Sequence, residues 1–186
     1  MVIHLRGFLR ILVVSNTEFK YDLGVVGLGY VGLPLAVESA TSSLNVLGFD
    51  INSERVEMIN NGHSPIEDIS NEELSQSHKN FHSTIESKEL SQCRNIVISV
   101  PTPLTDYQPD LSYVVNAAKT VGENLVKNQV VILESTTYPG TTLEVLIPNL
   151  EKMSGLKAGE EFFVGYSPER IDPGNEVWKF KNTPKV

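Results

Sequence analysis

The stretch LGVVGLGYVGLPLA, residues 23–36, carries the pattern that decides the fold. A short apolar run leads into Gly27, Gly29 and Gly32, and an apolar helical segment follows. In this context the G-x-G-x-x-G spacing predicts a phosphate-binding turn between a strand and a helix. Gly27 permits the tight turn, Gly29 lets a pyrophosphate approach the backbone, and Gly32 allows the helix to pack closely on the strand.

Asp50 strengthens this prediction. It ends a second apolar run, about 20 residues after the glycines, as dinucleotide-binding folds require. A carboxylate there can accept hydrogen bonds from both hydroxyls of an adenosine ribose and repels a 2′-phosphate, which favours NAD over NADP. The free N–H groups of the helix N-terminus would bind the pyrophosphate. Methyltransferases use a similar turn for adenosylmethionine, and this pattern alone leaves that alternative open.

The rest of the chain alternates short apolar runs with longer amphipathic segments. This rhythm is typical of βαβ units in a parallel sheet. It predicts an α/β fold, a doubly wound Rossmann-type parallel sheet in a single domain. One helix is expected to start at Asp110, and another near residue 141, where Pro148 should kink or shorten it. The predicted strands are residues 23–26, 46–49, 96–100, 130–133 and 162–164.

The domain is expected to cover residues 21–170. Residues 1–20 form an extension that could be an extra strand, a frayed arm or an upstream addition, and residues 171–186 form a tail. Residues 62–80 are polar and irregular, which predicts a loop with one short helix.

Composition excludes several classes of function. The 186 residues carry a formal net charge of −8, which argues against binding nucleic acid through neutralised phosphates. No apolar run approaches the roughly 18 residues of a membrane-spanning helix. Arg6 and Arg10 interrupt the N-terminal apolar stretch, so a secretory signal is not expected. We therefore expect a cytoplasmic protein without nucleic-acid or membrane partners.

The cysteine and histidines offer little chemistry. The single Cys93 excludes an internal disulfide and a cysteine-rich zinc site, and we expect it in a helical segment, small and partly buried. His78 and His82 could share a helix face, but their surroundings are polar and offer no third ligand. A solvated surface is the better interpretation, and no metal site is predicted.

Hydroxyl-rich segments with proline follow the later predicted strands, at residues 101–103, 134–140 and 165–170. Ligands of doubly wound sheets bind beyond the carboxyl ends of the strands, so these segments should share one edge with the glycine turn. Any one of them alone is explained by strand ends and helix caps. Glu169 is the candidate for general acid/base catalysis, and Arg170 for binding an anionic or carbonyl group.

Four motifs in order resemble the N-terminal NAD-binding domain of the UDP-glucose/GDP-mannose dehydrogenase family, the nucleotide-sugar 6-dehydrogenases. They are GVVGLGYVGLPLA, SVPTPL followed by PDLSYV, VVILESTTYPGTT and FFVGYSPERIDPG. Within the family, the chain most resembles the branch acting on UDP-N-acetylhexosamines, above all the UDP-N-acetylglucosamine 6-dehydrogenases. The UDP-glucose branch usually has Phe in place of Arg170 and Glu in place of Pro173.

The resemblance implies NAD-dependent oxidation of the C6 alcohol of a UDP-sugar to a carboxylate, in two steps through a cysteine-bound thiohemiacetal and thioester. It implies that Glu169, assisted by Thr136, positions or activates the water that hydrolyses the thioester. Arg170 and Ile171 would lie against the substrate. The residues that would contact NAD are Gly27, Gly29, Tyr30, Val31, Gly32, Asp50, Arg55, Thr102 and Thr136.

The family's nucleophilic Cys and its supporting Lys, Asn and Asp belong to later segments with no counterpart in this sequence. We therefore expect a fragment or an isolated cofactor domain that is inactive alone. Its expected partners are a UDP-sugar and the family's C-terminal sugar-binding domain, with a homodimer forming when that region is present. The alternative is a non-catalytic NAD-binding or regulatory module that acts with a separate subunit.

Overall fold

The computed structural model describes residues 18–105 and 108–169. Most of the expected N-terminal extension and the expected tail lie outside these residues. Within them, no helix is both long and apolar enough to cross a membrane.

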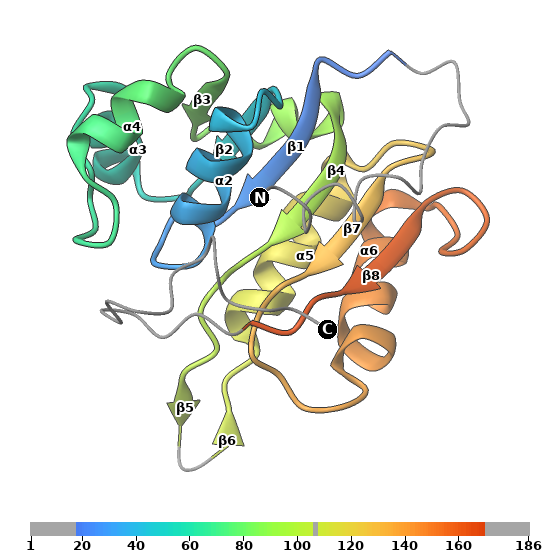
Figure 1. Ribbon diagram of the computed structural model, residues 1–186. Helices are drawn as coiled ribbons and strands as arrows, with labels where there is room; N and C mark the ends of the chain where they lie inside the picture. The colour runs from blue at the N-terminus through green and yellow to red at the C-terminus, as the bar shows by residue number, and fades with distance from the viewer. Residues whose placement is uncertain (1–17, 106–107, 170–186) are drawn as a thin grey trace.

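A six-stranded parallel sheet forms the centre of the molecule (Figure 1). Its strand order is β3-β2-β1-β4-β7-β8, so the direction of winding reverses between β1 and β4. Ligands of such folds bind at this reversal, beyond the carboxyl ends of the strands. The strands are β1 (Tyr21–Val26), β2 (Val46–Phe49), β3 (Phe81–Thr84), β4 (Cys93–Ile98), β7 (Val130–Leu133) and β8 (Phe163–Tyr166).

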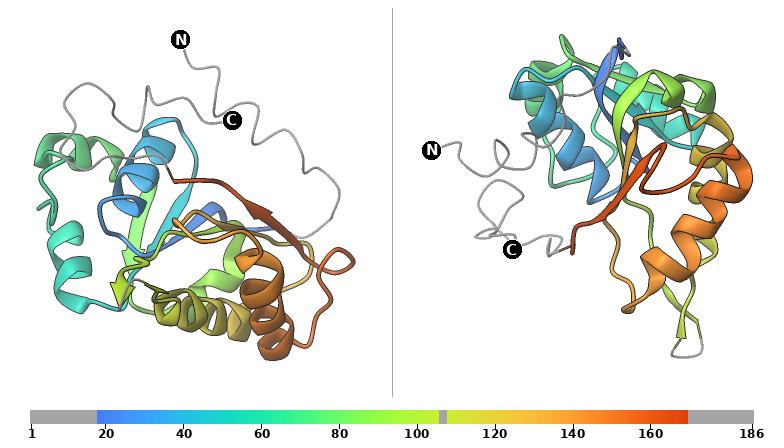
Figure 2. Two further views of the ribbon diagram at one scale, coloured as in Figure 1. Left: turned by 90° about the horizontal axis from the view of Figure 1, so that it is seen from below. Right: turned by 90° about the vertical axis from the view of Figure 1, so that its right-hand side faces the viewer.

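Helices cover both faces of the sheet (Figure 2). One face carries α2 (Gly32–Thr41), α3 (Ser53–Asn60) and α4 (Asn71–Ser77). The other carries the 3₁₀-helix η2 (Ser87–Gln92), α5 (Ser112–Asn124), the π-helix η3 (Thr142–Leu146) and α6 (Ile147–Ser154). A small hairpin of β5 (Leu104–Thr105) and β6 (Gln108–Pro109) projects beyond the sheet.

The sheet separates two apolar cores because neighbouring strand residues point to opposite faces. Val25 packs in the core under α2, and Val26 packs in the core under α5. Both faces are covered, which explains the continuous apolar runs of the central strands. The doubly wound α/β fold predicted from the sequence is confirmed.

The strand predictions differ from the structure mainly at the edges. Residues 46–49 and 130–133 match β2 and β7, whereas β4 begins three residues earlier than predicted. The sequence analysis missed β3, an edge strand of sequence FHST. All of its residues except His82 are buried, but His82, Ser83 and Thr84 are polar, so it lacks the continuous apolar run that marked the other strands.

One prediction of local structure is wrong. Cys93 is the first residue of β4, not part of a helix, and it is fully buried. It pairs with Tyr21 and lies so near Gly24 that a Cβ added there would be 2.8 Å from its Sγ. His78 follows the last residue of α4, and His82 lies on β3, so they share no helix face. In the described ranges, no group of three or more His, Cys, Asp or Glu side chains could hold a metal ion.

Two predicted helix features are present with small shifts. Asp110 accepts a hydrogen bond from the Ser112 N–H at 2.8 Å, two residues into the predicted helix. That N–H bond lowers the pKa of Asp110. Pro148 lies in the first turn of α6, directly after the π-helix η3, so the regular α-helix is shortened, as proline predicted.

Candidate functional site

The glycine turn joins β1 to α2 at the reversal of the sheet. Gly27 has φ +94°, and a Cβ there would be 2.9 Å from the carbonyl oxygen of Ser99. A Cβ on Gly32 would be 1.8 Å from the carbonyl oxygen of Gly27. A Cβ on Gly29 would meet nothing within 4 Å. Two glycines are therefore required by the fold itself, while the third leaves open space beside the backbone.

Unpaired backbone donors line this open space. Within the described residues, the N–H groups of Gly29, Tyr30 and Val31 have no hydrogen-bond acceptor. The carbonyls of Gly29 and Val31 accept the N–H groups of Leu33 and Leu35, so the first turn of α2 is already formed. Donors at a helix N-terminus, with no side chain in the way at Gly29, fit a pyrophosphate.

Asp50 has a structural role in addition to the ligand-binding role predicted from the sequence. Only 4% of the residue is exposed. Its Oδ2 accepts the Leu28 N–H at 2.8 Å and Arg55 Nη1 at 2.9 Å, and its Oδ1 accepts the Asn52 N–H at 2.9 Å. Because Leu28 belongs to the glycine turn, Asp50 ties the end of β2 to the phosphate-binding segment. The ribose binding predicted for Asp50 would add to the three hydrogen bonds that this carboxylate already accepts.

Arg55 reaches Asp50 from α3. The side chain of Asn52 caps this helix by accepting the Arg55 N–H at 3.0 Å, which sets the start of α3 beside the end of β2. The family resemblance implied that Arg55 contacts the cofactor, and the structure adds that it forms an ion pair with the Asp50 carboxylate.

Hydroxyl groups connect the loops that follow β4 and β7. Thr102 Oγ1 donates to the carbonyl oxygen of Thr136 at 2.6 Å, and Ser135 Oγ donates to that of Val100 at 2.8 Å. The two threonines predicted to contact the cofactor therefore come together. Ser99 Oγ, at 3.1 Å from the carbonyl oxygen of Gly27, links this pair of loops to the glycine turn. Sequence analysis missed Ser99, although a serine ending an apolar strand could have marked it.

Glu169 is half-buried in the segment that follows β8. Two residues before it, the Ser167 N–H donates to the carbonyl oxygen of Leu133 at 3.0 Å, and Ser167 Oγ donates to Oε1 of Glu134 at 3.3 Å. The buried Glu134 was also missed, and it anchors this segment to the end of β7. Arg170 and Ile171, the predicted substrate contacts, lie outside the described residues.

Comparisons with known proteins show which family this chain resembles. The family model for the NAD binding domain of the UDP-glucose/GDP-mannose dehydrogenase family matches residues 21–186. The chain is 42% identical to a UDP-N-acetyl-D-glucosamine 6-dehydrogenase of Salmonella typhi and 43% identical to one of Pseudomonas aeruginosa. These matches cover 90% and 88% of this chain, and 39% of each relative. The chain thus spans about two fifths of the length of these curated relatives.

Solved structures of the same family have the same fold. A GDP-mannose dehydrogenase of Pseudomonas aeruginosa superposes with a TM-score of 0.78 at 31% identity, over 82% of this chain and 37% of that one. A UDP-D-ManNAc dehydrogenase of Pyrococcus horikoshii superposes with a TM-score of 0.75 at 39% identity, over the same shares. The glycine turn alone left open whether the ligand is adenosylmethionine or NAD, and the family model decides in favour of NAD. The chain belongs to the UDP-glucose/GDP-mannose dehydrogenase family and contains its NAD-binding domain.

Proposed function

We propose that the chain is the cofactor domain of an enzyme that oxidises the C6 alcohol of a UDP-sugar to the carboxylate. The observation that carries the proposal is the glycine turn, with its unpaired N–H groups and buried Asp50, at the same sheet edge as Thr136 and Glu169. A UDP-N-acetylhexosamine is the proposed substrate class, with UDP-N-acetylglucosamine first. Two relatives at 42% and 43% identity carry that sugar in their names, while one at 39% is named for UDP-N-acetyl-D-mannosamine.

The glycine turn and the loop after β2 would hold the adenosine half of the cofactor. The N–H groups of Gly29, Tyr30 and Val31 bind the pyrophosphate, and Asp50 and Arg55 bind the adenosine ribose. Gly27 and Gly32 keep the turn close enough to α2 for this contact. NAD, when bound, accepts the hydride from the sugar.

The loops after β4, β7 and β8 would hold the reacting end. Thr102 and Thr136 contact the cofactor, and Glu169, with Thr136, positions the water that releases the product. Arg170 and Ile171 bind the sugar nucleotide. Fixing the cofactor and the sugar at one edge brings the transferred hydrogen near its acceptor.

The nucleophilic cysteine has to come from sequence outside these 186 residues. Cys93 is the only cysteine in the sequence, and it lies buried at the start of β4, at the opposite edge of the sheet from the glycine turn. Burial raises the pKa of its thiol to about 12. A protonated, inaccessible thiol does not act as a nucleophile.

The proposal includes the cytoplasm as the compartment and a homodimer as the assembly of the complete enzyme. A single, buried, free cysteine is in keeping with a reducing compartment. The homodimer is an expectation from the family, and sedimentation of the complete enzyme tests it.

Calorimetric titration tests cofactor binding on the chain as it stands. NAD is expected to bind, NADP more weakly, and adenosylmethionine not at all. Absence of heat with NAD would overturn the proposal.

A reconstitution tests the substrate class. The chain is mixed with the separately expressed C-terminal portion of the Pseudomonas aeruginosa relative, and NADH absorbance is followed with UDP-N-acetylglucosamine, UDP-N-acetylmannosamine and UDP-glucose. The fastest turnover is expected with UDP-N-acetylglucosamine, and the Glu169→Gln chain is the matched control. NAD binding with no turnover on any sugar would favour the non-catalytic module.

A further inference from the structure

The two members of the ion pair between Asp50 and Arg55 differ in their exposure to solvent. The side chain of Asp50 is 5% exposed, whereas that of Arg55 is 35% exposed. A ligand that approaches the end of β2 therefore meets the guanidinium before the carboxylate.

The hydrogen bonds of Asp50 leave little acceptor capacity for a ribose. A carboxylate offers about four lone-pair sites, and three donors already use Asp50. Two of these donors, Leu28 and Asn52, are backbone N–H groups that the turn and the cap hold in place. Arg55 supplies the third from a side chain, which can rotate away. Binding both ribose hydroxyls therefore requires Arg55 to leave Asp50.

We propose that Arg55 sets the coenzyme selectivity of this site, as a ligand for the 2′-phosphate of NADP for which Asp50 competes. A released guanidinium can bind a phosphate through two parallel N–H bonds. Asp50 then weakens NADP binding in two ways, by competing with the phosphate for Arg55 and by repelling the phosphate. The inference rests on the adenosine-ribose role given to Asp50 in the proposed function.

The test compares NAD and NADP affinities of the chain by calorimetry at constant ionic strength. The variants are Asp50→Asn, Arg55→Gln and the double variant. Asp50→Asn keeps the shape of the side chain and releases Arg55, so NADP affinity should rise on the order of tenfold, in line with one charge-assisted hydrogen bond. Adding Arg55→Gln should remove that gain. Arg55→Gln alone should weaken NADP by a larger factor than NAD.

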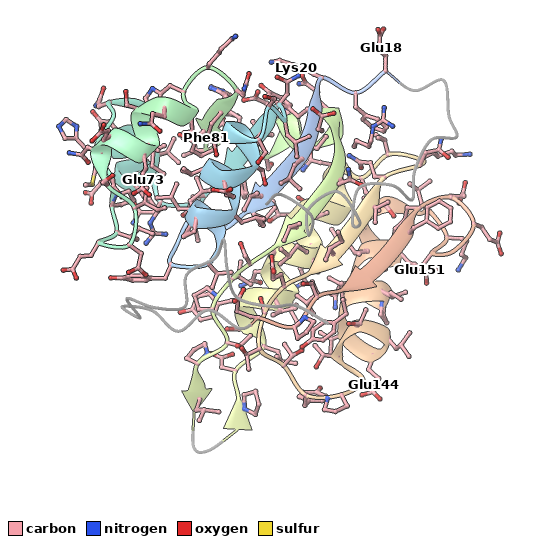
Figure 3. All side chains as sticks on the ribbon, viewed as in Figure 1. Glu18, Lys20, Glu73, Phe81, Glu144 and Glu151 are labelled. Atoms are coloured by element: carbon pink, nitrogen blue, oxygen red, sulfur yellow. The ribbon has the colours of Figure 1, made fainter. Side chains whose placement is uncertain are left out.

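Lys79→Gln provides the charge control. Lys79 is exposed and lies two residues before Phe81 (labelled in Figure 3), the first residue of β3. Because β2 and β3 are parallel, Lys79 lies toward the amino edge of the sheet, whereas Asp50 follows β2 at the carboxyl edge. Its loss removes the same charge without touching the ion pair. An equal loss of NADP affinity in Lys79→Gln and Arg55→Gln would overturn the inference in favour of a general charge effect.

The outcomes separate this inference from the proposed function. If the unaltered chain fails to bind NAD, both fall. If it binds NAD but the ratio of NADP to NAD affinity is the same in Arg55→Gln as in the unaltered chain, only the inference falls. Thermal unfolding of each variant is recorded, and if Asp50→Asn does not fold, the ratio in Arg55→Gln decides the matter alone, because Arg55 lies closer to the surface.

Discussion

The two halves of the carboxyl edge are built differently. On one side, the ends of β1 and β2 are locked by backbone packing and by three hydrogen bonds to the buried Asp50. On the other side, the loops after β4 and β7 are linked by two hydroxyl bonds, of which the Thr102–Thr136 bond is exposed. The half assigned to the cofactor's adenosine end is thus preorganised, while the half assigned to the reaction is held by few side-chain contacts.

This difference fits the tasks proposed for the two halves. A pyrophosphate and ribose bind in one geometry, so rigid donors add affinity by lowering the ordering required on binding. The reacting edge has to admit a sugar and release a product, and lightly held loops can adjust for this. The following predictions measure how large the difference is.

The largest effect is expected from Gly32→Ala in the locked half. Its Cβ would be 1.8 Å from a backbone oxygen, so the turn and α2 have to move apart. We expect a loss of about 3 kcal/mol in the free energy of unfolding, measured by urea denaturation, and loss of NAD binding. Gly29→Ala is the matched control, because its Cβ meets nothing. It should leave stability nearly unchanged and weaken NAD binding alone; equal destabilisation by both variants would contradict the packing argument.

Asp50→Ala should have the next largest effect. It leaves the Leu28 and Asn52 N–H groups and the Arg55 guanidinium without their acceptor. We expect a loss of about 2–3 kcal/mol in urea denaturation, as for a buried ion pair with one partner removed. Asp50→Asn, which keeps an acceptor oxygen, should lose less. If stability were unchanged in Asp50→Ala, the carboxylate would serve ligand binding only.

Cys93 lies at the amino edge of the sheet, outside both halves. The titration of its thiol reports on the stability of the whole domain. Below about pH 8.5, the ordinary thiol pKa, the thiol is protonated in the folded and unfolded states alike. Between that pH and about 12, the unfolded chain loses the proton while the folded chain keeps it, so stability falls as pH rises. The slope approaches about 1.4 kcal/mol per pH unit.

Comparison with Cys93→Ala isolates this contribution from the lysines and tyrosines that titrate in the same range. Urea denaturation at several alkaline pH values should show a steeper decline for the unaltered chain. Parallel profiles for the two proteins would rule out the raised thiol pKa.

The smallest effect is expected from Thr102→Val in the lightly held half. The substitution keeps the shape of the side chain and removes the hydroxyl that bonds the Thr136 carbonyl. Because this bond is exposed to water, we expect a loss of about 0.5–1 kcal/mol in urea denaturation. Thr102→Ser should retain most of the stability. A loss as large as that of Asp50→Ala would mean that the two halves are equally rigid.

Local patterns predicted much of the fold and of the cofactor site. The glycine spacing, the strands at residues 46–49 and 130–133, and the place of Asp50 at a strand end follow from neighbours in the chain. The edge strand β3 escaped prediction because its polar residues leave no apolar run. Cys93 was assigned to the wrong element because a short polar 3₁₀-helix ends directly before it.

The sequence by itself determined the turn that recognises a dinucleotide, because the backbone conformation at Gly27 and the packing at Gly32 depend on residue type and spacing. Only the tertiary structure decided how the site is held together. The bonds from Leu28 to Asp50, from Thr102 to Thr136 and from Ser167 to Glu134 join residues 22 to 34 positions apart. Parallel strands bring such residues to one edge, and the geometry of those contacts comes from the packed sheet rather than from any local pattern.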